Sequence, residues 1–283
     1  HREGDVVEIN GLEFGYSRKK PLFRGLDLRI APGAMCGLLG KNGAGKTSLL
    51  RIMAGLLFPR AGSSRVLGLE SGRRHPSTMA DVFLVPEEFA LPELSVKDYV
   101  DTRAVFYPRF DRAALDRALD ELEVPGGGRL NSYSYGQRKK FLIAFAVAAG
   151  SRLVLLDEPT NGLDIPSKSR LRKLLIGSVS EERCFVISTH QVRDLASILD
   201  PVVILDNGKV LLDIDLETLG RRVTGTTVAE EPTEGSVLWY ERVPGGYHVL
   251  EKNNGTASRE VDMELLFNAV TQQPQRILPL LEA

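Results

Sequence analysis

The sequence contains no long apolar run. None of its uninterrupted apolar stretches approaches the 18 or so residues that a helix needs to cross a bilayer. The nearest candidate, residues 141–150, is short and rich in alanine, which is more typical of a buried helix. The sequence therefore predicts no membrane-spanning helix.

Cysteine is scarce, and charge of either sign is never concentrated. Cys36 and Cys184 are the two cysteines, each flanked by apolar residues, so there is neither a disulfide framework nor metal-ligand spacing. The chain has 36 basic and 37 acidic residues, a net charge of −1, and no long block of like charge. This composition excludes a disulfide-rich secreted domain and gives no basic field for nucleic acid.

The most informative motif is a phosphate-binding pattern, G-x-x-x-x-G-K-[ST]. It is present at residues 40–47, Gly-Lys-Asn-Gly-Ala-Gly-Lys-Thr. In such a loop the glycines let backbone N–H groups surround a phosphate, Lys46 adds a positive charge, and Thr47 offers a hydroxyl to Mg²⁺. An apolar stretch at 34–39 predicts a strand before the loop, and 48–55 predicts a helix whose N-terminal end faces the phosphates. A chance glycine-rich turn, the alternative, would not need these flanking elements.

A second candidate site lies at residues 153–158, an apolar run that ends in Asp157 and Glu158. A buried parallel strand has this pattern, and its C-terminal end lies at the ligand edge of the sheet. Asp157 is expected to hold Mg²⁺ through water, and Glu158 to act as general base on the attacking water. Alone, the acidic pair is more typical of a solvated turn, but together with the phosphate loop it predicts a P-loop nucleotide hydrolase.

The rest of the chain predicts an α/β fold in two parts. Alternation within residues 5–30 predicts antiparallel strands with turns at 10–11 and 31–33, and apolar runs predict buried strands at 82–85, 185–188 and 202–205. A helical arm is expected at about 90–145, with Ser95 and Asp111 as N-caps. After residue 220 we expect a polar linker at 224–234, a hairpin within 237–250 and a helix at 262–270. The predicted domains are residues 1–220 and 221–283.

Five further features accompany the two phosphate motifs. They are Tyr16, Pro86-Glu87 at a strand end, Tyr133-Ser134-Tyr135-Gly136-Gln137 before a helix, Asn161-Gly162-Leu163-Asp164, and Ser188-Thr189-His190. In this order the chain resembles the ATP-binding-cassette (ABC) ATPases over residues 5 to about 218. The resemblance implies a P-loop core with a mixed, mainly parallel sheet, an N-terminal antiparallel β subdomain and an inserted helical arm, followed here by a small α+β extension.

The resemblance also implies a role for each motif, with ATP and Mg²⁺ as ligands. ATP would be bound by Tyr16, stacked on the adenine, and by Gly40, Lys41, Asn42, Gly43, Ala44, Gly45, Lys46, Thr47 and Ser48. Thr47, Glu87 and Asp157 would hold Mg²⁺, Glu158 would be the base, and His190 would contact the γ-phosphate. Ser134, Tyr135, Gly136 and Gln137 would form the signature that touches the nucleotide of a second subunit, and Asp164 would belong to the loop that crosses the dimer.

Several of these residues have plainer alternatives. Tyr16 could be a strand aromatic packed on the core, His190 a capping or core histidine, Ser134 only an N-cap, and Glu87 a solvated loop residue. The run Arg138-Lys139-Lys140 is interpreted as a solvated face without chemistry. The chain also departs from the family pattern: Tyr133 and Tyr135 replace a leucine and a glycine of the signature, and Glu87 replaces a glutamine.

For function, the resemblance implies the ATPase subunit of a transporter. It would pair with an identical or related cassette and act on a separate permease at the cytoplasmic side of the plasma (inner) membrane. The Pro-Glu-Glu sequence at residues 86–88 favours export. A cassette ATPase of DNA or ribosomes is the alternative, but the chain has no heptad run and only one cassette, so no nucleic-acid partner is expected. A GTPase or kinase is disfavoured because no Asn-Lys-x-Asp sequence is present.

Overall fold

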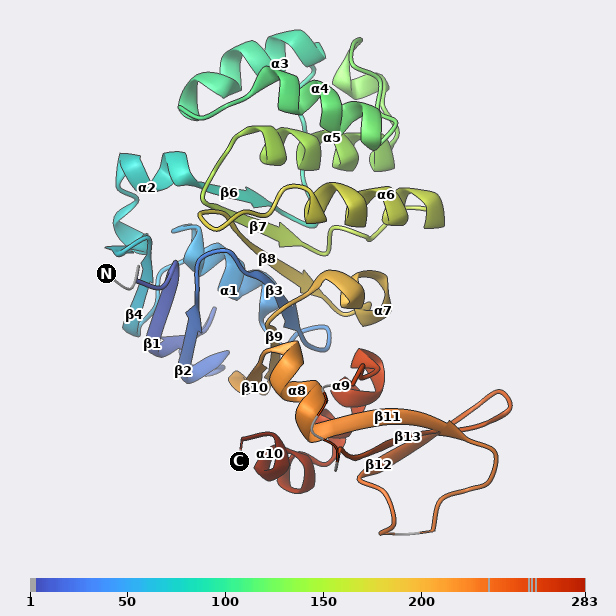
Figure 1. Ribbon diagram of the computed structural model, residues 1–283. Helices are drawn as coiled ribbons and strands as arrows, with labels where there is room; N and C mark the ends of the chain where they lie inside the picture. The colour runs from blue at the N-terminus through green and yellow to red at the C-terminus, as the bar shows by residue number, and fades with distance from the viewer. Residues whose placement is uncertain (1–3, 234, 254, 256, 258, 283) are drawn as a thin grey trace.

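The computed structural model describes residues 4–233, 235–253, 255, 257 and 259–282, arranged around three β-sheets (Figure 1). The central sheet has the strand order β10-β9-β3-β8-β7-β6, with all neighbours parallel except β10, which is antiparallel to β9. Its strands are β3 (Met35–Leu39), β6 (Val82–Val85), β7 (Leu153–Asp157), β8 (Cys184–Thr189), β9 (Val202–Asp206) and β10 (Lys209–Ile214). The apolar runs therefore predicted the parallel core correctly.

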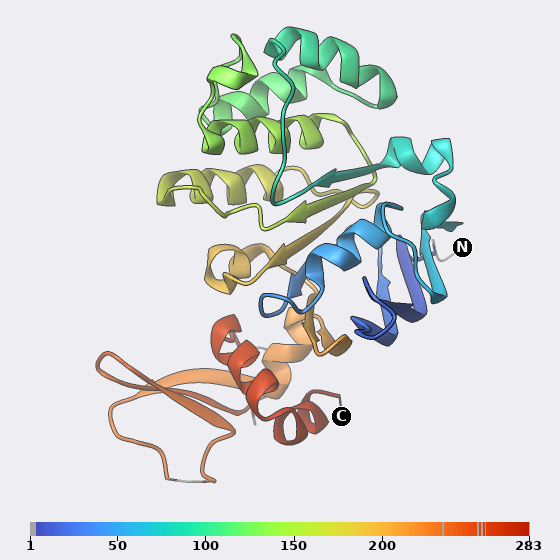
Figure 2. The same cartoon turned by 180° about the vertical axis from the view of Figure 1, so that it is seen from behind.

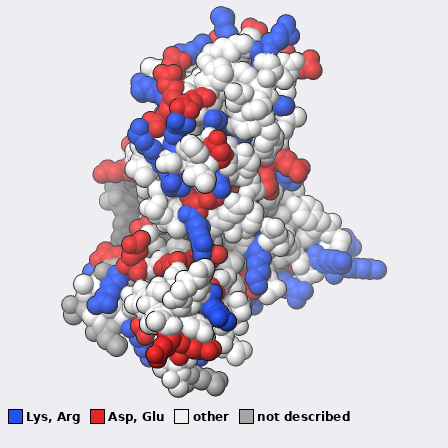
Figure 3. All heavy atoms as spheres, turned by 90° about the vertical axis from the view of Figure 1, so that its right-hand side faces the viewer, with Lys and Arg blue, Asp and Glu red and all other residues white. Residues whose placement is uncertain are grey.

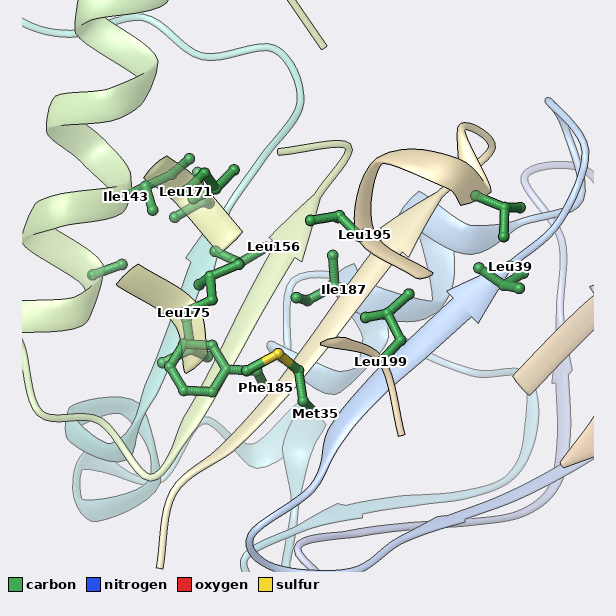
Figure 4. Packing of buried hydrophobic residues seen from close by; sticks show 14 of the residues in the cluster. Met35, Leu39, Ile143, Leu156, Leu171, Leu175, Phe185, Ile187, Leu195 and Leu199 are labelled. Atoms are coloured by element: carbon green, nitrogen blue, oxygen red, sulfur yellow. The ribbon is translucent and has the colours of Figure 1, made fainter. Parts of the chain in front are cut away.

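The two faces of the central sheet are buried in different clusters. Cys36 and Leu38 point into one cluster, while Met35 and Leu39, on the same strand, point into the other. This alternation follows from the two-residue period of a strand, and burial on both faces explains why these strands have almost no polar positions. Helices α6 (Ile165–Ile176) and α7 (Val192–Leu195) cover the second face, where the side chains of Figure 4 interlock.

On the other face, an antiparallel sheet and helix α1 (Lys46–Met53) pack against the core sheet (Figure 2). This second sheet has the order β2-β1-β4-β5 and comprises β1 (Val7–Phe14), β2 (Phe23–Ile30), β4 (Ala61–Val66) and β5 (Leu69–Glu70). The predicted turn at Asn10-Gly11 is wrong, because β1 runs straight through it with a shift of register against β2. Gly11 has φ +56°, and its N–H donates to Asp27 (2.7 Å). An Asn-Gly pair can supply this left-handed backbone to a bulge as well as to a turn.

The predicted helical arm stands beyond the β6 edge of the core sheet (Figure 1). It consists of α3 (Val96–Arg103), α4 (Arg112–Glu121) and α5 (Tyr135–Ala148), and α2 (Pro76–Asp81) precedes β6. Ser95 and Asp111 accept backbone N–H bonds at the starts of α3 and α4, as expected for N-caps. Helix α5 is buried over most of its length because it packs between α4 and the core sheet.

A small α+β extension lies at the opposite end of the core sheet, beyond β9 and β10 (Figures 1 and 2). Helix α8 (Leu216–Arg222) leads into the sheet β11-β13-β12, made of β11 (Val223–Val228), β12 (Trp239–Val243) and β13 (Gly246–Lys252), and then into α9 (Met263–Gln272) and α10 (Pro274–Glu282). The hairpin and α9 confirm the predictions. The predicted linker at 224–234 is partly wrong: its first five residues belong to β11, which pairs with β13, and residue 234 lies outside the described residues.

Candidate nucleotide site

The glycine-rich loop joins β3 to the N-terminus of α1, as its sequence predicts. Gly43 and Gly45 have φ of +83° and +103°, a backbone conformation that only glycine adopts readily. At Gly45 an added Cβ would also lie 2.7 Å from the Phe23 ring, so the loop needs glycine there for space as well. Lys46 is buried, and its ammonium donates to the carbonyls of Gly40 (2.7 Å) and Lys41 (3.2 Å).

Strand β7 brings the acidic pair next to this loop. The Lys46 ammonium is 3.7 Å from Glu158 Oε1, and the same oxygen accepts hydrogen bonds from His190 N (3.0 Å) and lies 2.8 Å from His190 Nδ1. Burial lowers the pKa of Lys46, while Glu158 and Asp157 oppose that shift. The second oxygen, Glu158 Oε2, is buried and has no hydrogen-bond partner among the described residues. One carboxylate oxygen is therefore held in place, and the other is an acceptor without a hydrogen-bond partner among the described residues.

Glu158 is also unusual in its backbone. Its φ of +46° lies in the left-handed region, which costs a non-glycine residue roughly 1–3 kcal/mol. The turn is held by Ser188, whose carbonyl and hydroxyl oxygens both accept from Glu158 N (3.1 and 3.2 Å). Because β7 and β8 are parallel neighbours, His190 just beyond β8 is brought alongside Glu158.

Thr47 and Asp157 offer oxygen ligands of the kind that Mg²⁺ prefers. Thr47 Oγ1 donates to Asp157 Oδ2 (2.7 Å), and Ser188 Oγ donates to Asp157 Oδ1. Asp157 is buried. The two side chains thus fit a cation held partly by water and phosphate oxygens, with Asp157 acting through water, since both of its oxygens already accept hydrogen bonds. Within the described residues no cluster of three His, Cys, Asp or Glu side chains could hold a metal alone.

Tyr16 lies outside β1 and is 67% exposed, so the alternative of a core aromatic is wrong. Its hydroxyl is 2.8 Å from Ser48 Oγ, and its ring stands edge-on to Phe14 with 5.1 Å between centroids. The ring is therefore fixed beside the start of α1 with an open face, which is the placement that stacking on a base would require.

The signature segment begins α5. Ser134 Oγ accepts from Gln137 N (3.2 Å) and Gln137 Oε1 accepts from Ser134 N (2.9 Å), a complete capping box. Residues 134–137 share a pocket of about 400 Å³ with residues 162–164. Asp164 N-caps α6 by accepting from Ser167 N (2.9 Å). The Ser167 hydroxyl, and then this N–H, lower the pKa of Asp164. In the described part of the chain, no hydrogen bond or ion pair joins this segment to its own phosphate loop.

Glu87 follows β6 and contacts the turn 158–161, which starts at Glu158. Its Oε1 accepts from Asn161 Nδ2 (2.8 Å), and its backbone carbonyl accepts from the Tyr135 hydroxyl (2.9 Å). The Tyr135 ring also stacks on Phe89, with 5.6 Å between centroids. Glu87 is therefore not merely a solvated loop residue, and Tyr135 packs against the segment that follows β6.

The family now follows from comparison with known proteins. The ABC transporter family model matches residues 23–161. The chain is 33% identical over 226 residues to the aliphatic sulfonates import ATP-binding protein SsuB 2 of Xanthomonas axonopodis pv. citri, covering 78% of this chain and 75% of that protein. The chain belongs to the ABC transporter ATP-binding family.

Other relatives belong to the same family, but their names indicate different physiological roles. The daunorubicin resistance ATP-binding protein DrrA3 of Streptomyces coeruleorubidus is 29% identical, with 77% of this chain and 72% of that protein covered. A solved ATP-binding subunit of an ABC transporter superposes with a TM-score of 0.67 at 25% identity, over 75% of this chain and 90% of that one. The chain is thus an ABC ATPase that hydrolyses ATP. Among the described helices, none combines the length and the apolar composition that a bilayer-spanning segment needs.

Sequence reasoning missed one member of this cassette site. Lys139 belongs to the run interpreted as a solvated face, yet it is fully buried, and its neighbour Lys140 is also buried. The Lys139 ammonium donates to the carbonyls of Glu158 (2.7 Å) and Asn161 (3.1 Å). The interpretation failed because α5 is covered on almost every side, so three adjacent basic residues could not all face water. The apolar run at 141–149 that follows was the available signal.

Proposed function

We propose that this chain is the ATPase subunit of an ABC exporter, in which two cassettes close around ATP and drive a separate membrane permease. The observation that supports this most is the arrangement of the two half-sites. Glu158, His190 and Lys46 converge at the phosphate loop, whereas among the described residues no hydrogen bond or ion pair joins the signature segment to that loop. A second cassette is needed to bring a signature to the nucleotide.

In this proposal the chain's own groups have separate tasks. Backbone N–H groups of residues 40–47 and the Lys46 ammonium bind the phosphates, and Tyr16 stacks on the adenine. Thr47, Glu87 and Asp157 would hold Mg²⁺, and the ion when bound would offset the negative charge of the phosphates. Glu158 takes a proton from the attacking water, and His190, hydrogen-bonded to Glu158, orients that carboxylate and reaches the γ-phosphate.

A dimer that binds nucleotide between its subunits accounts for the shared pocket of the signature and residues 162–164. A dimeric ATP-binding cassette solved with ADP and Pi has this fold, with a TM-score of 0.65 at 21% identity. ATP bound by both chains would stabilise the dimer, and hydrolysis would release it.

Export is the finer part of the proposal. Related proteins named for import and for drug resistance lie at comparable identity, so relatedness alone does not give the direction. The support for export is Pro86-Glu87-Glu88 at the end of β6, a sequence typical of exporters whose permease is a separate chain. The permease would hold the cassette at the cytoplasmic side of the plasma membrane.

Affinity purification of the tagged chain from detergent-extracted native membranes tests the proposal. We expect a polytopic membrane protein to co-purify in stoichiometric amount, and untagged cells to yield none. Vesicles containing the pair with the cassette outside should accumulate labelled substrate in the lumen when ATP is added. Recovery only with ribosomes or nucleic acid, lost at high salt, would contradict the transporter assignment. ATP-driven efflux from those vesicles would contradict export alone.

A further inference from the structure

Lys139 is a buried cation that the proposed catalytic roles leave unused. It sits in the second turn of α5 and is among the largest fully buried side chains of the described residues. Burial lowers the pKa of its ammonium, while Glu87, Glu158 and Asp157 oppose that shift. Removing an ammonium from water is costly unless its N–H donors make hydrogen bonds. The two acceptors of Lys139 therefore indicate its role.

Both acceptors are backbone carbonyls of one short turn. Lys139 Nζ donates to Glu158 O at 2.7 Å and to Asn161 O at 3.1 Å, and Asn161 N itself donates to Glu158 O at 3.2 Å. The ammonium therefore spans the first and last residues of the turn 158–161. This turn starts with Glu158 in its left-handed conformation, which needs support from its surroundings to persist.

The same turn connects to two other parts of the site. Asn161 Nδ2 donates to Glu87 Oε1 (2.8 Å), and the Tyr135 hydroxyl donates to Glu87 O. The centroid of the Tyr135 ring lies 5.8 Å from the Lys139 ammonium. Lys139 thus lies where the start of α5, the segment after β6 and the acidic turn meet. A shift of any one of these three segments would therefore displace the Glu158 carbonyl oxygen.

We propose that Lys139 is a positioning residue for ATP hydrolysis: it fixes the turn 158–161 and so aims the Glu158 carboxylate at the attacking water. The inference rests on the proposed role of Glu158. It assigns Lys139 no contact with nucleotide. Loss of its ammonium should therefore reduce turnover without weakening ATP binding.

The test compares Lys139→Met with Arg183→Met. Both substitutions remove a cation that donates to backbone carbonyls next to α5, but Arg183 bonds to residues 146, 147 and 151 at the C-terminal end of that helix, away from the turn 158–161. We expect Lys139→Met to lower kcat about tenfold to a hundredfold, as a misplaced catalytic group does, with KM and the ATP dissociation constant within about threefold. Arg183→Met should keep kcat within about threefold. Equal losses in both variants would overturn the proposal, as would an effect of Lys139→Met on KM alone.

A double variant separates positioning from general damage. If Lys139 acts through Glu158, adding Lys139→Met to Glu158→Gln should not reduce the residual rate further, because residues acting as a unit are not additive. A further loss of the same tenfold to hundredfold would show that Lys139 acts independently. If Lys139→Met does not fold, as judged by thermal unfolding, Lys139→Gln takes its place in both comparisons. Full activity of Glu158→Gln alone would instead refute the base assignment, so the two failures are distinguishable.

Discussion

At Lys46 a buried ammonium is surrounded by two carbonyl oxygens and one carboxylate. These contacts hold the side chain over the loop and keep its charge where phosphate oxygens would lie. A bound phosphate would offer stronger, charge-assisted hydrogen bonds than the neutral carbonyls do.

Lys46→Ala should therefore weaken ATP binding itself. A hydrogen bond to a charged group contributes roughly 1.5–3 kcal/mol, which corresponds to about a tenfold to a hundredfold increase in the dissociation constant. Isothermal titration calorimetry with Mg-ATP measures this, and Lys97→Ala, an exposed lysine on α3 that pairs with Asp101, is the control. An unchanged dissociation constant would count against the loop assignment.

Glu87 gives a second test at the scale of one residue. A carboxylate in place of an amide adds a negative charge beside the site, and this charge should affect Mg²⁺ more than it affects the chemistry. We expect Glu87→Gln to keep hydrolysis within about tenfold, since its carbonyl oxygen can still accept from Asn161, but to shift the Mg²⁺ concentration for half-maximal rate. The exposed neighbour Glu88 supplies the control Glu88→Gln. Identical Mg²⁺ titrations for wild type and Glu87→Gln would remove Glu87 from the site.

Single residues also show where sequence reasoning stops. The loop at 40–47 and the acidic pair could be predicted because their chemistry requires fixed residue types at fixed spacing. Lys139 could not, because a lysine next to two other basic residues is indistinguishable from surface until tertiary packing buries it. The contact between Tyr135 and Glu87, 48 residues apart, depends likewise on how the arm sits on the sheet.

Helices and strands with a clear hydrophobic pattern or N-cap were predictable from the sequence. Those that form only by pairing with a distant segment were not. The five parallel strands are apolar runs, and α3 and α4 begin at visible caps. Strand β11 escaped prediction because its Thr-Gly-Thr-Thr sequence looks like a loop and becomes a strand only by pairing with β13. The Asn10-Gly11 bulge was mistaken for a turn because both need the same backbone.

The capping box of α5 allows a test in which stability and chemistry separate. Ser134→Ala should lower the free energy of unfolding by about 1 kcal/mol and Ser134→Gly by only a few tenths, measured by urea denaturation. Both variants lose the hydroxyl. If that hydroxyl also contacts the γ-phosphate bound by the second cassette, both should lose ATPase activity to a similar degree. A glycine variant with wild-type activity would leave Ser134 as a cap only.

At the scale of the whole molecule, the hydrophobic core is continuous across the predicted domain boundary at residue 220. Leu219 and Ile204 from the cassette side share one buried cluster with Leu250 and Leu266 from the extension. Arg193 on α7 also forms an ion pair with Glu264 on α9.

Basic and acidic side chains are intermingled over the face drawn in Figure 3. The surface of that face therefore gives no single-sign field that would bind a polyanion.

The continuous hydrophobic core predicts cooperative unfolding. Leu266→Ala on α9 should cost about 2–5 kcal/mol, the usual range for a fully buried leucine, and should lower the midpoint of one thermal transition without splitting it. Differential scanning calorimetry measures both quantities. Two resolved transitions, with only one shifted by the substitution, would show that residues 221–283 fold as a separate unit.

The most direct test of the central claim, hydrolysis by Glu158 within an ATP-closed dimer, is the Glu158→Gln variant studied with Mg-ATP. The amide can still hydrogen-bond water but is a poor base, so phosphate release should fall by about 10²–10⁴-fold while ATP binding is retained. Size-exclusion chromatography in Mg-ATP should then show a stable dimer, and Lys46→Ala in the same background should abolish it. Full ATPase activity of Glu158→Gln, or a variant that binds ATP yet stays monomeric, would contradict the account.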